Sequence, residues 1–198
     1  KLIIISGPSG SGKTTLSKKI LRKYMNGIVL STDNYYKTGI ISKVLSKLVV
    51  SYFERKISFN FRLFNKDFNY IIENSDSKHN YSYDFKNKKI KKSLKKTNNI
   101  EFLIVEGIFS KEILSQPNKK NCFFIELRTS KDSCMERVIN RDVNERGKIK
   151  EHAEIDFLKS WDFYYRKNNQ RKKIENELIL TKTKDIYLIL NQILNLKN

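Results

Sequence analysis

One stretch near the amino terminus decides the fold: Ile3-Ile4-Ile5-Ser6-Gly7-Pro8-Ser9-Gly10-Ser11-Gly12-Lys13-Thr14-Thr15. Its apolar start predicts a buried strand, its glycines a tight turn, and its end the first turn of a helix. Gly7, Gly12, Lys13 and Thr14 fit every fixed position of the phosphate-loop pattern G-x-x-x-x-G-K-[ST]. A glycine turn that binds nothing is the alternative, but the place of the pattern between a strand and a helix favours phosphate binding.

The residue types of this loop suit a nucleoside triphosphate. Glycines let backbone N–H groups approach a polyphosphate, and the helix start adds its positive dipole end. Lys13 would supply charge to the terminal phosphates, and the Thr14 hydroxyl can join a Mg²⁺ shell. We therefore expect ATP, or GTP, together with Mg²⁺. The residues predicted to hold the nucleotide are Gly7, Ser9, Gly10, Ser11, Gly12, Lys13, Thr14 and Thr15.

Composition limits the class of protein. The chain has 198 residues, which suits one α/β domain over residues 1–198. Its 40 Lys and Arg against 21 Asp and Glu give a formal net charge of +19. Such an excess is typical of polyanion binders. Because the basic residues are spread along the whole chain, we interpret the charge as general composition and do not expect nucleic acid as a partner.

The cysteines and the hydropathy indicate a setting. Cys122 and Cys134 have neither metal-ligand spacing nor a disulfide framework, which favours a reducing, cytoplasmic environment. No apolar run reaches the ~20 residues of a membrane span. We accordingly expect neither a membrane partner nor a signal peptide.

The hydrophobic pattern predicts alternating strands and helices. Strands are expected over residues 1–6, 28–31, 100–105, 122–127 and 178–180. Helices are expected over 13–25, 40–53, 131–142, 151–167 and 185–196. Residues 54–98 form the least regular part, rich in aromatic residues, Lys and Asn, and we interpret them as an insertion that binds the acceptor.

Two carboxylates follow predicted strands directly. Asp33 comes after residues 28–31, and Glu106 ends the strand over 100–105. In open α/β sheets ligands bind at the carboxyl ends of the strands, so both should lie near the phosphate loop. Asp33 suits a general base for an acceptor hydroxyl, with a helix or turn cap as the alternative role. Glu106 suits a Mg²⁺ ligand, directly or through water.

Five short segments, in order, resemble landmarks of the uridine kinase family, which belongs to a wider group with phosphoribulokinase. They are the phosphate loop, Ser31-Thr32-Asp33-Asn34-Tyr35-Tyr36, Tyr83-Asp84-Phe85, Glu106-Gly107-Ile108, and Arg137 through Gly147. The resemblance covers residues 2 to about 150 and is weaker over 54–80. It implies a three-layer α/β/α fold with a five-stranded parallel sheet in the order 2-3-1-4-5 and a lid at about 137–150.

The resemblance also implies roles for matching residues. Lys13, Arg141 and Arg146 would act on the transferring phosphoryl group, Arg137 and Arg141 would hold the nucleotide, and Thr14 with Glu106 would hold Mg²⁺. The residues implied at the acceptor are Asp33, Tyr36, Arg62, Tyr83, Lys88 and Arg146. Two of these depart from the family pattern: Arg62 stands where the family has a ribose-binding acid, and Lys88 where it has a histidine that touches the base.

The resulting hypothesis is transfer of the ATP γ-phosphoryl group to a hydroxyl of a small molecule, with uridine or cytidine as the first candidate. A phosphorylated or acidic sugar-like acceptor is an alternative, because Arg62 and Lys88 are cationic. A nucleotide-dependent switch or nucleic-acid-associated NTPase is a further alternative, as is a paralogue that has lost its acceptor. A homo-oligomer is possible, but no segment of the sequence identifies an interface.

Overall fold

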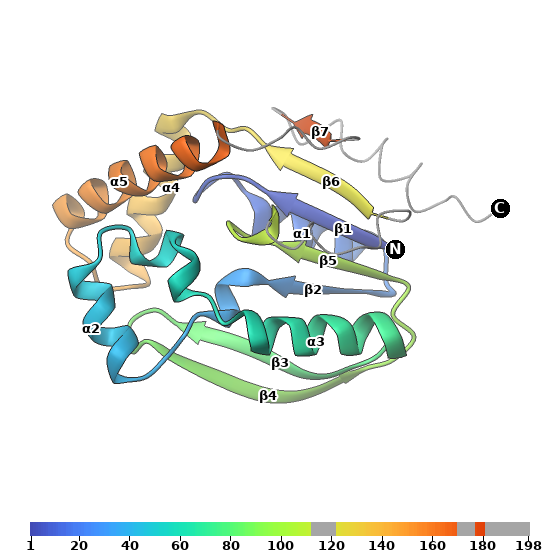
Figure 1. Ribbon diagram of the computed structural model, residues 1–198. Coiled ribbons are helices and arrows are strands. Elements are labelled where there is room, and N and C mark those ends of the chain that lie inside the picture. Colours follow the sequence, from blue (N-terminus) through green and yellow to red (C-terminus); the bar gives the residue numbers. More distant parts are fainter. Residues whose placement is uncertain (112–121, 170–176, 181–198) are drawn as a thin grey trace.

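A five-stranded parallel sheet forms the centre of the molecule (Figure 1). The computed structural model describes residues 1–111, 122–169 and 177–180. The strands are β1 (Leu2–Ser6), β2 (Gly27–Ser31), β5 (Phe102–Glu106), β6 (Cys122–Leu127) and β7 (Glu177–Leu180). Their order is β2-β5-β1-β6-β7, and every pairing is parallel. Counted along the chain this is the order 2-3-1-4-5, so the prediction is confirmed.

Helices cover both faces of the sheet, as the three-layer prediction requires. Side chains alternate along β1: Ile3 and Ile5 pack with Leu16 and Ile20 of helix α1 (Lys13–Lys23). Ile4 faces the other way, into a cluster that includes Phe64 and Phe68 of helix α3 (Phe61–Asn74). The near-continuous apolar strands follow from this burial on both sides.

Helices α4 (Lys131–Asn144) and α5 (Lys150–Asn169) form a pair near β6 (Figure 1). Cys134 and Val138 of α4 pack against Phe157 of α5 in a small separate core. The predicted helices over 131–142 and 151–167 are confirmed with slightly longer bounds. No helix among the described residues is long and apolar enough to cross a membrane. The predicted helix over 185–196 lies outside the described residues.

Helix α2 (Ile40–Leu48) is shorter than the prediction over 40–53. Val49 is extended, and Ser51 adopts a left-handed conformation with φ 53°, which stops the helix. Two 3₁₀ turns follow, η2 (Tyr52–Glu54) and η3 (Lys56–Ser58). The spacing of apolar residues predicts the helix correctly up to Leu48, but it does not indicate that the helix ends there.

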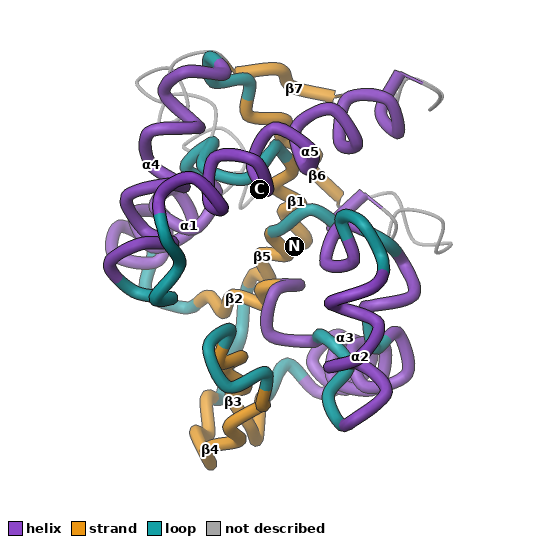
Figure 2. Tube along the Cα trace, turned by 90° about the vertical axis from the view of Figure 1, so that its left-hand side faces the viewer, coloured by secondary structure: helices purple, strands orange, loops and turns teal. Residues whose placement is uncertain are grey.

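Residues 54–98, the least regular part of the sequence, contain one helix and two strands that the sequence did not predict. Helix α3 begins where the Asn60 side chain accepts a hydrogen bond from Leu63 N at 3.1 Å, and it ends at Ser75 in a left-handed cap. An antiparallel ribbon of β3 (Ser77–Asp84) and β4 (Lys89–Thr97) follows. Figures 1 and 2 both show this ribbon beyond β2, at the end of the molecule opposite β7.

The predicted lid at 137–150 is mostly helical. Residues up to Asn144 belong to α4 and Lys150 begins α5, so only residues 145–149 lie outside helices. The division of the chain into one domain with an insertion and a lid stays a prediction.

Candidate functional site

The sheet register brings the predicted catalytic segments together. Glu106 at the end of β5 pairs with Ile5 of β1 on one side and with Ser31 of β2 on the other. The phosphate loop starts two residues after Ile5, and Asp33 lies two residues after Ser31. The three segments therefore emerge side by side at the carboxyl edge of the sheet, where ligands of such folds bind.

The phosphate loop has the backbone that its glycines predict. Gly10 has φ +80°, and a Cβ there would lie 2.5 Å from the carbonyl oxygen of Cys134. Ser11 N donates to Pro8 O at 3.2 Å and closes the turn. The hydroxyl of Ser11 is buried and lacks a hydrogen-bond partner among the described residues. A buried hydroxyl of this kind is suited to hydrogen-bond a phosphate oxygen.

Lys13 lies against its own loop. Its Nζ donates to Gly7 O at 2.9 Å and to Pro8 O at 2.8 Å. Burial lowers the pKa of Lys13, and the carboxylates of Glu106 and Asp33 oppose this effect. A buried cation that contacts loop carbonyl oxygens and feels the charge of two carboxylates has the chemistry to neutralise terminal phosphates.

The two predicted Mg²⁺ ligands are in contact. Thr14 Oγ1 donates to Glu106 Oε1 at 3.1 Å. Burial raises the pKa of Glu106, and the nearby charge of Asp33 raises it further, while Lys13 lowers it. A hydroxyl and a carboxylate at a phosphate site are hard oxygen donors of the kind that Mg²⁺ prefers, so these residues fit the ion.

Asp33 lies on the 3₁₀ turn η1 (Thr32–Tyr35), which directly follows β2. This turn packs closely on the end of β5, because a Cβ at Gly107 would lie 1.9 Å from Thr32 Oγ1. Gly107 has φ +130°, so the glycine permits both the backbone angle and the approach of η1. Glu106-Gly107 at the end of β5 thus positions Asp33 as well as the Glu106 carboxylate.

A cavity of about 460 Å³ opens next to Asp33. It lies between the phosphate loop, the α2–η2 segment, the ribbon turn, and helices α4 and α5. Such a volume accommodates a small metabolite. The polar and aromatic side chains that line it include Ser9, Asp33, Tyr36, Glu54, Phe85, Lys88, Arg141, Asp142, Arg146, Lys148, Asp156 and Ser160.

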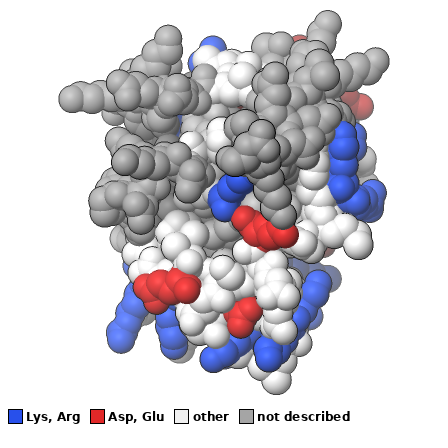
Figure 3. Space-filling model, turned by 90° about the vertical axis from the view of Figure 1, so that its right-hand side faces the viewer, with Lys and Arg blue, Asp and Glu red and all other residues white. Residues whose placement is uncertain are grey.

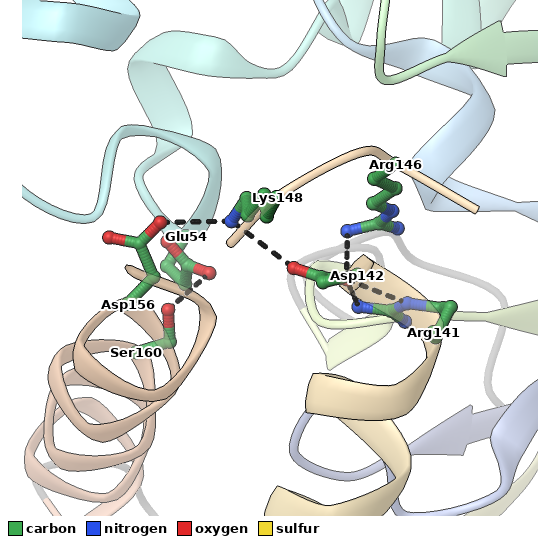
Figure 4. A network of polar contacts seen from close by, with 7 residues as sticks. All are labelled: Glu54, Arg141, Asp142, Arg146, Lys148, Asp156 and Ser160. Atoms are coloured by element: carbon green, nitrogen blue, oxygen red, sulfur yellow. Dashed lines mark hydrogen bonds and ion pairs between the residues drawn. The ribbon is translucent and has the colours of Figure 1, made fainter. Parts of the chain in front are cut away.

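Asp142 pairs with three basic residues of the predicted lid (Figure 4). Its Oδ1 pairs with Arg141 Nη2 at 2.8 Å and Arg146 Nη1 at 3.1 Å, and its Oδ2 pairs with Lys148 Nζ at 3.1 Å. Burial alone would raise the pKa of Asp142, but the adjacent arginines outweigh it and the pKa is lowered. The guanidinium of Arg146 also lies 3.7 Å from the ring centroid of Phe85. Three cations are thereby presented at the cavity.

Of the other predicted residues, three lie at the cavity or the phosphate loop and two do not. Tyr36 and Lys88 line the cavity. Arg137 reaches the phosphate loop, where its Nη1 donates to Gly10 O at 3.2 Å. Tyr83 is not among the cavity-lining residues; it is buried, with its ring 5.3 Å from that of Tyr36. Arg62 is exposed on α3 and does not line the cavity either.

Sequence reasoning missed Glu54. It lies on η2 in the cavity wall, and its Oε1 accepts a hydrogen bond from Ser160 Oγ of α5 at 2.8 Å (Figure 4). Burial raises the pKa of Glu54, and the Ser160 hydrogen bond opposes this. Glu54 follows no predicted strand and matches no motif, so no local signal marked it. Lys148 and Phe85 also line the cavity, and the sequence analysis named them only within longer segments.

Comparison with known proteins identifies relatives along most of the chain. The Phosphoribulokinase / Uridine kinase family matches residues 2–181. A uridine kinase of Borrelia duttonii is 31% identical over 162 residues, which cover 81% of this chain and 76% of that protein. A uridine kinase of Ureaplasma parvum is 29% identical over 153 residues, which cover 74% and 71%.

Solved structures agree on the fold. A putative fructose transport system kinase from Silicibacter sp. TM1040 superposes with a TM-score of 0.67 at 14% identity, covering 91% of this chain and 89% of that one. A possible uridine kinase from Bacillus stearothermophilus gives a TM-score of 0.57 at 14% identity, covering 89% and 87%. At these identities the likeness concerns the fold alone.

Proposed function

The chain belongs to the phosphoribulokinase/uridine kinase family, and from this premise we propose that it transfers the γ-phosphoryl group of ATP to a hydroxyl of a pyrimidine nucleoside, uridine or cytidine. The observation that carries the proposal is the position of Asp33. Its carboxylate lines one cavity together with Ser9 of the phosphate loop and with Arg141 and Arg146. An acceptor in this cavity has a base, a phosphate site and cationic groups around it.

The residues divide the work of phosphoryl transfer. The phosphate loop and Lys13 bind the triphosphate, and Thr14 with Glu106 would hold Mg²⁺, which neutralises phosphate charge when bound. Asp33 orients the acceptor hydroxyl and accepts its proton. Arg141 and Arg146 stabilise the charge that develops on the transferring group. Arg137, which contacts the Gly10 carbonyl, positions the loop beneath the phosphates.

The walls of the cavity suit a nucleoside. Tyr36 and Phe85 provide aromatic surface, with ring centroids 5.8 Å apart, while Glu54, Lys88 and Ser160 provide hydrogen-bonding groups. A heterocyclic base with an attached sugar needs this combination of apolar and polar surface. The named relatives are uridine kinases, which supports the same acceptor class.

The direct test is ADP release from ATP and Mg²⁺ with and without uridine or cytidine, with mass detection of the product. A monophosphate product with matching ADP release is the expected result. The control is the Asp33→Asn variant, which should bind ATP and release no ADP in response to the acceptor. Absence of a nucleoside product in a wild-type protein that binds ATP would overturn the proposed acceptor.

An anionic acceptor is the second candidate, and a group of lysines supports it. Lys47, Lys88 and Lys148 line the cavity. Burial lowers the pKa of Lys88, and the charges of Lys47, Lys43 and Lys148 lower it further. Such mutual repulsion is relieved when an anion binds. A panel of sugar phosphates in the same assay distinguishes this candidate, because turnover of an anionic acceptor without turnover of nucleosides would select it.

A further inference from the structure

The ribbon of β3 and β4 concentrates positive charge. Residues 77–97 hold eight lysines and one acidic residue, Asp84, so this tenth of the chain carries more than a third of the formal net charge of +19. Seven of the eight lysines are exposed. Basic side chains project from the lower edge of the face in Figure 3, at the height of the ribbon in Figure 1. The lysines are Lys78, Lys86, Lys88, Lys89, Lys91, Lys92, Lys95 and Lys96.

The two faces of the ribbon differ in character. Tyr83 and Ile90 pair across the strands and pack towards the core. The residues that alternate with them lie on the opposite side, which we call the outer face. Aromatic side chains are confined to the inner side. The outer face consists of Asn80, Ser82, Asp84, Lys89, Lys91 and Ser93, all exposed apart from the half-buried Asp84.

The ribbon is accessible from outside. Among the described strands, β4 pairs only with β3, and its nine residues are exposed or half-buried throughout. Nine extended residues span about 30 Å. Figures 1 and 2 show the ribbon at one end of the molecule, so a long partner can lie along it without meeting α4 or α5.

We propose that the outer face of the β3–β4 ribbon binds double-stranded DNA. Lys89 and Lys91 of this face, together with the exposed lysines of β4 beside it, contact phosphates, and the Asn and Ser side chains of the face offer hydrogen bonds without stacking. A two-stranded ribbon fits the major groove of B-form DNA, which is about 12 Å wide. The major groove of A-form RNA is too narrow and deep for it. The absence of aromatic residues from the outer face argues against a single strand, which is held by stacking.

The fold also explains why such a surface escaped the sequence argument. Basic residues occur along the whole chain, which made their excess look like general composition. Lysines on an exposed edge strand also discourage pairing with other chains. That role accounts for charge along the free edge of β4. An edge-protecting role predicts no preference for a DNA duplex over an RNA duplex, so binding measurements separate the two roles.

The test is fluorescence anisotropy with a short labelled DNA duplex, measured on the full chain between about 50 and 200 mM salt. The test variant, Lys89/Lys91/Lys95→Gln, removes the two lysines of the outer face and the exposed Lys95 further along β4. It should lower affinity at least tenfold and reduce the slope of log affinity against log salt by about 3. The matched control is Lys18/Lys19/Arg22→Gln on the exposed side of α1, which removes the same charge. The corresponding Lys→Arg variant of the ribbon should retain binding.

Phosphoryl transfer should be unchanged in both Gln variants, because none of the six residues lines the cavity. Unchanged activity also shows that the variants are folded, and it keeps this test separate from that of the kinase function. Three outcomes would overturn the proposal: no binding by the wild type, equal losses in the ribbon and α1 variants, or equal affinity for an RNA duplex of the same sequence.

Discussion

The phosphate-loop edge and the acceptor side of the cavity are built in different ways. At the phosphate-loop edge, a backbone angle fixes Gly10, strand register fixes Glu106, and hydrogen bonds to the loop carbonyls hold Lys13. On the acceptor side, Tyr36, Phe85 and Glu54 come from turns that aromatic packing holds in place. The first kind of site is determined locally by sequence. The second exists only after distant segments have packed together, so substitutions should affect the two sides differently.

The largest effect is expected at the phosphate-loop edge. Asp33→Asn removes the proton acceptor without changing shape, so kcat should fall by about 10²–10⁴. The affinity for ATP should stay within about twofold, because Asp33 is outside the phosphate loop. Steady-state kinetics and ATP titration measure the two quantities. A fully active variant would remove Asp33 from the reaction.

Asp142→Asn tests whether the Asp142 carboxylate holds the three cationic side chains at the cavity. A buried carboxylate paired with Arg141, Arg146 and Lys148 is lost, so the free energy of unfolding should fall by about 3 kcal/mol at neutral pH. Because the folded pKa of Asp142 is lowered, its stabilisation is present above its ordinary pKa of 3.8 and is lost as pH falls through the folded pKa. Denaturant unfolding should therefore show the two proteins converging in acid. A constant difference would contradict this ionic role.

Glu54→Gln probes the acceptor side with a smaller expected effect. Loss of a carboxylate acceptor from the cavity wall should raise KM for the acceptor about tenfold, with KM for ATP unchanged. The raised pKa of Glu54 means that its charged form is disfavoured in the folded protein. The variant should be more stable at neutral pH by about 0.5–1 kcal/mol.

This gain should vanish below the ordinary pKa of 4.5, where Glu54 is protonated in both states. Ser160→Ala is the matched control, since it removes the hydrogen bond to Glu54 and keeps the charge. A rise in KM for ATP would show that Glu54 serves the nucleotide instead.

Arg62→Asp should have the smallest effect. Although Arg62 replaces a family acid in the sequence, its side chain is exposed on α3 and is not part of the cavity wall. Acceptor preference should change by less than about twofold. Lys88→Gln is the comparison, because Lys88 lines the cavity and should shift preference between neutral and anionic acceptors. A large effect of Arg62→Asp would place α3 at the acceptor.

The sheet was predictable because its signals are local. Apolar strands, the glycine loop and the carboxylates after Ser31 and Val105 lie in short segments whose spacing fixes their place at the sheet edge. The family resemblance supplied the strand order. The strand predicted over 122–127 and the helix predicted over 131–142 were equally clear, and they correspond to β6 and α4.

The acceptor side was less predictable for a physical reason. The polar, lysine-rich ribbon lacks a clean alternation, because β4 is exposed along most of its length and only Ile90 packs against the core. The sequence of β4 alone does not indicate a strand, and its pairing with β3 appears only in the structure. Glu54 enters the cavity because the chain reverses at Ser51 and η2 packs on α5, and no periodicity within residues 49–58 encodes that contact.

The shared register of Ile5, Glu106 and Ser31 has a consequence for how this protein evolves. Main-chain hydrogen bonds between β1, β5 and β2 do not depend on side-chain identity, so the geometry of the reaction is inherited with the sheet itself. The α2–η2 segment and the ribbon are attached to that sheet through contacts between aromatic side chains, which other apolar side chains can replace. Lineages that share the same sheet are thus free to change what they phosphorylate while retaining how they do it.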